Sequence, residues 1–177
     1  TFFAENREAM VEVAQALTRV YENGGRLFTM GNGGSSCDAA HVAVEFQHPV
    51  TSGRPALTAV NLGADTAMMT AVGNDVGFSH VYVRQLIALA RKGDGLIGIS
   101  TSGNSKNVIE AIHAAHEREL GVIALTGNGG GQIAEVLYHG DIHLCVPSNI
   151  TARIQEVHLL CLHCLCDTID YLLLGAE

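Results

Sequence analysis

The chain has 177 residues, which is enough for one domain with a substantial core. Apolar residues make up 47% of it and charged residues only 16%, a balance that argues against intrinsic disorder. The net charge of −8 argues against a nucleic-acid surface, which needs clustered Lys and Arg, but not against a small phosphorylated ligand held by backbone N–H groups and hydroxyls.

Short apolar or β-branched segments predict five strands. In chain order they are Arg26–Met30, Leu57–Leu62, Leu96–Ser100, Val122–Thr126 and Ile142–Val146. Their lack of polar alternation favours strands that are buried on both faces. Helical periodicity fills the intervals, as in residues 104–118. Strands that alternate with helices predict βαβ units, a parallel sheet covered on both faces, and a single domain over residues 1–177.

Two predicted helices frame this domain. The first runs to about Tyr21 and ends at the stop signal Asn23-Gly24-Gly25. The last runs from about Ile150 to Leu174 and is apolar over much of its circumference. Such a helix packs against another helix or another subunit, so an oligomer is expected.

The expected location is the cytoplasm, without a membrane span. Five cysteines are an odd number and no signal peptide is visible, which favours free thiols in a reducing compartment. The longest apolar run, Val157–Cys166, is interrupted by His158 and His163 and is too short to cross a bilayer.

Two loops rich in glycine and serine follow predicted strands. Gly31-Asn32-Gly33-Gly34-Ser35-Ser36 follows the first strand, and Ser100-Thr101-Ser102-Gly103-Asn104-Ser105 follows the third. Glycines let the backbone approach an anion, and free N–H groups at a helix start favour negative charge. One such loop occurs in many α/β proteins without a ligand. Two of them in one small sheet predict a phosphate site, while the absence of Gly-x-Gly-x-x-Gly and of a Walker lysine disfavours a nucleotide.

With further ordered motifs, these loops resemble the sugar isomerase (SIS) family, and within it most closely the phosphoheptose isomerases. The further motifs are His41 with Glu45, Gly73-Asn74-Asp75 and Arg153-Ile154-Gln155-Glu156. The resemblance runs from about Arg7 onward. It implies a three-layer αβα sandwich of flavodoxin-like SIS architecture around a five-stranded parallel sheet, assembled as a homotetramer. It also implies that most of a first helix precedes Thr1.

The implied activity is the conversion of sedoheptulose 7-phosphate to D-glycero-D-manno-heptose 7-phosphate through an enediol, for lipopolysaccharide or other heptose-glycan synthesis. Glu45 is expected to be the base and His163 an acid/base. The implied substrate-binding set comprises Asn32, Gly33, Gly34, Ser35, Glu45, Asn74, Asp75, Ser100, Thr101, Ser102, Ser105 and Gln155.

The resemblance also implies a zinc ion held by His41, Glu45, Gln155 and His163. His41 and Glu45 are four residues apart and share a helix face. Gln155 and His163 are eight apart, about 12 Å along a helix, so they meet one ion only by extending toward each other.

Other positions have plain structural interpretations. Without the resemblance, Asn74-Asp75 is a turn before Gly77. The cysteines of the last helix, Cys161, Cys164 and Cys166, are interpreted as packing residues rather than a metal cluster. Six histidines are interpreted as surface or turn residues: His48, His80, His113, His116, His139 and His143.

The chain departs from the family pattern at two positions: Pro49 stands where many members carry Arg, and Ala152 where some carry Asp. Both departures bear on recognition of the sugar hydroxyls. Two non-enzymatic readings remain beside the isomerase. One is a sugar-phosphate-binding SIS protein that associates with the replication initiator, and the other is a sugar-phosphate-sensing regulator. The presence of Glu45 and His163 favours the enzyme.

Overall fold

A computed structural model describes residues 1–49 and 53–175 of the chain. Its strands are β1 (Leu27–Gly31), β2 (Ala59–Asn61), β3 (Gly95–Ser100), β4 (Gly121–Thr126) and β5 (Ile142–Cys145). The five predicted strands are thereby confirmed, with bounds shifted by one or two residues. They form one parallel sheet in the order β2-β1-β3-β4-β5, so the strand order reverses between β1 and β3.

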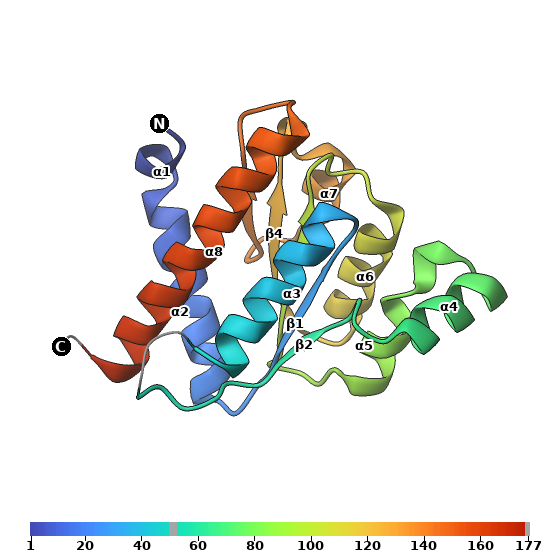
Figure 1. Cartoon of the computed structure of the whole chain (residues 1–177), viewed down its shortest axis with the longest axis horizontal. Coiled ribbons are helices and arrows are strands. Elements are labelled where there is room, and N and C mark those ends of the chain that lie inside the picture. Colours follow the sequence, from blue (N-terminus) through green and yellow to red (C-terminus); the bar gives the residue numbers. More distant parts are fainter. Residues whose placement is uncertain (50–52, 176–177) are drawn as a thin grey trace.

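Helices cover both faces of this sheet, which confirms the predicted three-layer sandwich (Figure 1). The helices are α1 (Phe2–Glu5), α2 (Arg7–Glu22), α3 (Gly34–Gln47), α4 (Thr66–Asp75), α5 (Val83–Leu89), α6 (Lys106–Glu117), α7 (Gly131–Val136) and α8 (Thr151–Leu174), with 3₁₀ turns η1 (Phe78–His80) and η2 (Asn128–Gly130). α2, α3 and α8 lie on one face, and α4 to α7 lie on the other.

Each central strand contributes side chains to two cores. In β1, Phe28 and Met30 pack with α4 to α7, whereas Leu27 packs with α2, α3 and α8. In β3, Leu96 and Ile97 point to opposite cores in the same way. Burial of both faces removes any need for polar alternation, which is why these strands read as continuous apolar runs.

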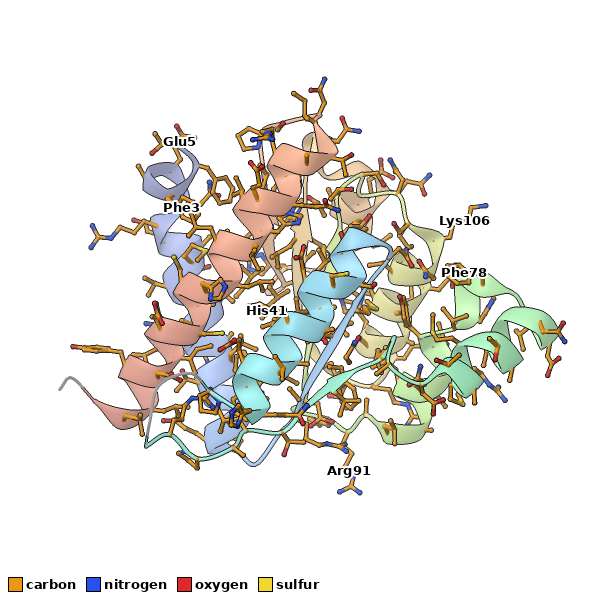
Figure 2. The ribbon with its side chains drawn as sticks, in the orientation of Figure 1. Phe3, Glu5, His41, Phe78, Arg91 and Lys106 are labelled. Carbon is orange, nitrogen blue, oxygen red and sulfur yellow. The ribbon has the colours of Figure 1, made fainter. Side chains whose placement is uncertain are left out.

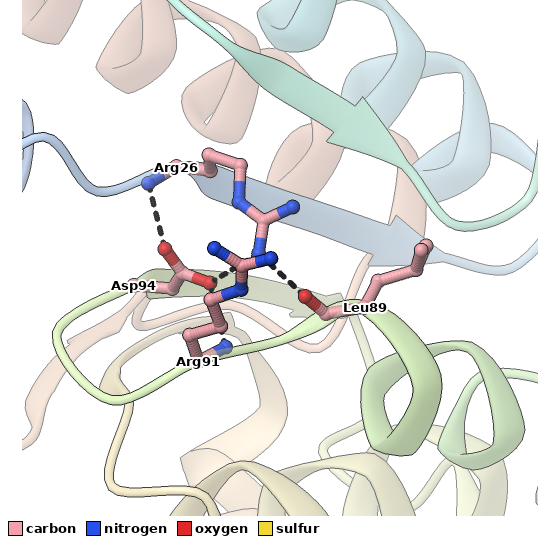
Figure 3. A network of polar contacts seen from close by, with 4 residues as sticks. All are labelled: Arg26, Leu89, Arg91 and Asp94. Atoms are coloured by element: carbon pink, nitrogen blue, oxygen red, sulfur yellow. Dashed lines mark hydrogen bonds and ion pairs between the residues drawn. The ribbon is translucent and has the colours of Figure 1, made fainter.

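A buried carboxylate fixes the amino ends of β1 and β3. Asp94 accepts hydrogen bonds from the backbone N–H groups of Arg26 and Arg91 at 2.9 and 2.8 Å, and it pairs with the Arg26 guanidinium at 3.0 Å. The same guanidinium donates to the Leu89 carbonyl (Figure 3). This network joins the starts of β1 and β3, at the end of the sheet opposite the two predicted phosphate loops.

The last helix, α8, is the most apolar element. Its 24 residues are long and apolar enough to span a membrane, and 33% of its most apolar 18-residue segment is buried within the chain. Helices that pack in the core of a soluble protein meet the same two criteria. α8 packs against α2 and α3 through Cys161, Leu162, Leu165 and Ile169.

Candidate active site

The two predicted phosphate loops lie side by side at the point where the strand order reverses. β1 and β3 are hydrogen-bonded neighbours, with Gly31 opposite Ile99, and each runs directly into its loop. In open α/β sheets, ligands bind beyond the carboxyl ends of the strands at such a point. α3 and α6 begin from these loops, and neither has a side chain capping its first N–H groups. Both helix starts therefore present N–H groups suited to an anion.

Polar side chains join the loops to each other. The amides of Asn32 and Asn107 exchange two hydrogen bonds, each of 2.8 Å. The Tyr82 hydroxyl donates to the Gly31 carbonyl, which fixes the start of the first loop. Ser100 and Ser105 share a hydrogen bond of 2.8 Å between their hydroxyls. The first and second loops therefore form one preorganised unit.

The remaining residues of the second loop define its outer surface. Ser102 is exposed, and its hydroxyl accepts from the Asn104 N–H at 3.2 Å. The Thr101 carbonyl accepts from the Gly127 N–H at 3.1 Å, which connects this loop to the one after β4. The Gly103 carbonyl accepts from the Ile133 N–H at 2.9 Å. This loop is thus supported on its protein side and open on its hydroxyl side.

Gln155 belongs to this loop region. A Cβ at Gly34 would overlap the Gln155 side-chain amide, so the start of α8 lies directly over the start of α3. Ser35 beside it is buried, whereas Gly33 is exposed with a φ of 55°. Positive φ values favour glycine. The Gly-Gly pair thus allows both the sharp turn and the close approach of α8.

A second group of side chains lies farther along the same two helices. The Nε2 atoms of His41 on α3 and His163 on α8 are 3.1 Å apart, and His41 Nε2 is 3.9 Å from Glu45 Oε1. Figure 2 shows His41 in the space between α3 and α8. The Glu45 side chain is only 15% exposed. Burial, and next to it the charge of Glu45, raise the pKa of the Cys166 thiol on α8 to about 12. Glu45 therefore faces α8.

The donor atoms of this second group suit a metal in part. Two nitrogens bound to a tetrahedral zinc at 2.0–2.1 Å stand about 3.3 Å apart, close to the His41–His163 spacing. Glu45 supplies a carboxylate beside them. Gln155 lies with the loops instead, as the spacing of eight residues predicts. Over residues 1–49 and 53–175, no three His, Cys, Asp or Glu side chains already stand in a metal-binding arrangement.

The loops and the second group lie at different positions along α3. Glu45 follows Gly34 by eleven residues on α3, about 16 Å along the helix axis. The predicted site residues thus form two clusters, one of phosphate-binding type and one of proton-transfer type.

Asn74 and Asp75 belong to neither cluster. They are the last two residues of α4, both exposed, and Asn74 Nδ2 donates to Asp75 Oδ1 at 2.7 Å. The interpretation of these residues as a turn is wrong, because the helix continues through Gly73 to Asp75 before Gly77 breaks it at a φ of 117°.

Sequence reasoning missed several buried polar groups. Burial raises the pKa of Asp38, one turn before His41, although the His41 charge opposes the shift. The sequence predicts His116 at the surface or in a turn, but its side chain is only 6% exposed and pairs with Asp141 at 2.7 Å. His143 is half-buried, and its Nε2 contacts Thr126 Oγ1 at 2.7 Å. The partners of both histidines lie far away in sequence, and no local pattern indicates them.

His158 predicts a pH-dependent stability. It is fully buried, its Nε2 donates to the Thr126 carbonyl at 2.9 Å, and burial lowers its pKa from the ordinary 6.5. The unfolded chain then binds protons more readily than the folded one, so the free energy of unfolding should fall as the pH drops below 6.5 and stay flat above it. Urea unfolding between pH 5 and 8 measures this, as about half of that range lies below the ordinary His value.

The matched variant is His158→Gln, whose amide retains a donor for Thr126 but does not titrate. It should flatten the slope in part, because burial also lowers the pKa of His143 and adds a dependence of the same sign. An unchanged slope in His158→Gln would place the pH dependence at other groups.

Comparison with known proteins gives a consistent result. The SIS domain family model matches residues 1–127. The phosphoheptose isomerase of Azoarcus sp. is 54% identical over 95% of this chain and 85% of its own length, and that of Aromatoleum aromaticum is 58% identical over 88% and 78%. The solved phosphoheptose isomerase of Neisseria gonorrhoeae superposes with a TM-score of 0.89 at 50% identity, covering 93% of this chain and 86% of that one. The chain therefore belongs to the SIS domain family and, within it, to the phosphoheptose isomerases.

Proposed function

We propose that this chain is the aldose–ketose isomerase that converts sedoheptulose 7-phosphate to D-glycero-D-manno-heptose 7-phosphate. The observation that carries the proposal is the meeting of His41, Glu45 and His163 between α3 and α8. α3 begins directly after the first phosphate loop, and the first turn of α8 places Gln155 against Gly34 of that helix start. The relatives named phosphoheptose isomerase, at about half identical residues, support the same substrate class.

The reaction needs one base and one acid. A base removes a proton from C1 of the ketose while an acid protonates the C2 carbonyl oxygen, which gives an enediol. Protonation at C2 and loss of the proton from the C1 oxygen then give the aldose. Glu45 is the proposed base, and His163 is the proposed acid. The Nε2 atoms of His41 and His163 lie 3.1 Å apart, so each ring limits the orientation of the other.

The two loops hold the phosphate in this proposal. Backbone N–H groups at the starts of α3 and α6, with the hydroxyls of Ser100, Ser102 and Ser105, form an uncharged nest. Such a nest binds a dianion without Lys or Arg, which agrees with the acidic net charge of −8.

The direct test is turnover of sedoheptulose 7-phosphate in deuterated water, followed by NMR. We expect an aldoheptose phosphate to form with solvent deuterium at C2, because an enediol exchanges its carbon-bound proton. An aldose without deuterium would contradict exchange with solvent. No product from a folded, metal-loaded protein would exclude this substrate.

The alternative of a non-catalytic protein that binds the replication initiator is less well supported. It accounts for the serine loops, but it gives no role to Glu45 and His163, which the structure places next to His41. Binding of sugar phosphate without turnover in the same NMR experiment would favour it.

Zinc is proposed for His41, Glu45 and His163, with Gln155 as the fourth ligand that the resemblance implies. Bound there, the ion would polarise the sugar oxygens. We expect metal analysis of the purified protein to find zinc, and His41→Ala to lose it. His113→Ala, an exposed histidine on α6, is the matched control and should keep it. Retention of the ion by His41→Ala would contradict this assignment.

We also propose that the subunits form a homotetramer in the cytoplasm. Apolar side chains remain exposed on α2 and α8, among them Val11 at 43%, Leu160 at 51% and Leu172 at 41%. All five cysteines have free thiols, as a reducing compartment requires.

A further inference from the structure

A buried arginine closes the C-terminal end of α3, the helix that carries His41 and Glu45. Arg54 is only 7% exposed. Its Nη2 donates to the Glu45 carbonyl at 2.6 Å, and its Nη1 donates to the Phe46 carbonyl at 2.9 Å. The guanidinium also lies 5.9 Å from the centre of the Phe46 ring. Arg54 therefore holds the backbone of the turn from which the Glu45 side chain projects.

The sequence explains why this turn needs an outside donor. In a continuing helix, the Glu45 carbonyl would accept from the N–H of residue 49, but residue 49 is proline and has no N–H. α3 accordingly ends at Gln47. The last carbonyls of a helix are left without partners and carry partial negative charge. The Arg54 guanidinium supplies both the missing donor and a complementary charge.

The other edge of the same guanidinium reaches α8. Arg54 Nε forms an ion pair with Asp170, and both side chains are largely buried, at 2% and 14% exposed. Asp170 follows His163 by seven residues, two turns along the same face of the helix and about 10 Å away. Burial raises the pKa of Asp170 and the Arg54 charge opposes that shift. One planar side chain thus joins the turn of Glu45 to the helix of His163.

We propose that Arg54 is a positioning residue for the isomerisation: by bridging the Glu45 turn to Asp170, it sets the separation of Glu45 and His163. The inference rests on the proposed function, in which these two groups share proton transfer. Arg54 acts on Glu45 through its backbone carbonyl and on His163 through Asp170 of the same helix. Displacement of catalytic groups by about 1 Å can cost 100-fold in rate.

The experiment compares Arg54→Lys with Arg26→Lys in the full chain. Lysine keeps the charge but not the planar fork that reaches two carbonyls and a carboxylate. Arg26 is the matched control, because it also joins a buried carboxylate and a backbone carbonyl, but at the opposite edge of the sheet. We expect Arg54→Lys to lower kcat about 10- to 100-fold with KM changed less than about threefold, and Arg26→Lys to leave both near wild type.

Equal losses of kcat in the two variants, in proportion to their losses of stability, would overturn the proposal, because Arg54 would then be a structural residue only. If Arg54→Lys fails to fold, Asp170→Asn is read by the same criteria. It removes the charge on α8 and leaves the Arg54 bonds to Glu45 and Phe46 intact.

A second readout does not depend on turnover. The imidazole ¹⁵N signals of His41 and His163 report the contact between their Nε2 atoms. They should move in Arg54→Lys and stay in place in Arg26→Lys, and unchanged signals in both variants would overturn the positioning role. If the wild-type protein does not isomerise sedoheptulose 7-phosphate, the proposed function fails, and these signals alone still decide whether Arg54 positions the two helices.

Discussion

Replacing Glu45 with glutamine is expected to lower kcat by about 100- to 10,000-fold, the range that a positioned general base contributes. Glutamine matches the shape of the carboxylate but cannot accept the C1 proton. The side chain is only 15% exposed and sits 3.9 Å from His41, so water cannot readily replace it as a base. Steady-state turnover of sedoheptulose 7-phosphate, with product detected by NMR, measures the loss.

The same variant should still bind the sugar phosphate, because the phosphate loops lie at the other end of α3. Isothermal titration with sedoheptulose 7-phosphate checks this. Glu117→Gln makes the same chemical change at an exposed position at the end of α6 and should retain full activity. A loss of turnover in Glu45→Gln of less than about tenfold would show that Glu45 is not the base, because a general base contributes about 100-fold or more.

The fold was predictable because its signals are local. Each strand is a run of apolar residues between turn residues, and burial on both faces keeps those runs free of polar interruptions. The helix stop at Asn23-Gly24-Gly25 was predictable for the same reason, since Gly24 adopts a φ of 72° that glycine tolerates best. The conformation of Asp75 was harder to predict, because an Asn-Asp pair occurs at the end of a helix as well as in a turn.

The candidate site was predictable only where it lies on one helix or in one loop. The four-residue spacing of His41 and Glu45 predicts a shared face, and the eight-residue spacing of Gln155 and His163 predicts their separation. Arg54 was not predictable, because its partner Asp170 lies more than a hundred residues later in the chain. Such an ion pair exists only after α3 and α8 have packed together.

The second loop is expected to be highly sensitive to a single methyl group. Gly103 has a φ of 68°, and a Cβ there would overlap the carbonyl oxygen of Gly130. The Cβ position is fixed by the backbone of residue 103 and the oxygen belongs to the backbone of Gly130, so neither can rotate away. Gly103→Ala should therefore lower the free energy of unfolding by about 1–2 kcal/mol for the left-handed backbone and by about 1–3 kcal/mol more for the overlap. Urea unfolding measures the sum.

Two glycine variants separate these contributions. Gly129→Ala has the same backbone strain, at a φ of 74°, but its Cβ meets nothing within 4 Å, so only the first loss is expected. Gly121→Ala meets nothing within 4 Å and has no left-handed φ, so its stability should stay near wild type. Gly103→Ala alone should also weaken binding of sedoheptulose 7-phosphate, because the overlap pushes Ser102 and Ser105 out of the phosphate nest. Equal stability of the Gly103 and Gly129 variants would show that the loop after β4 yields to the added methyl group. Intact binding in a Gly103→Ala variant that is destabilised by the full sum would place the phosphate elsewhere.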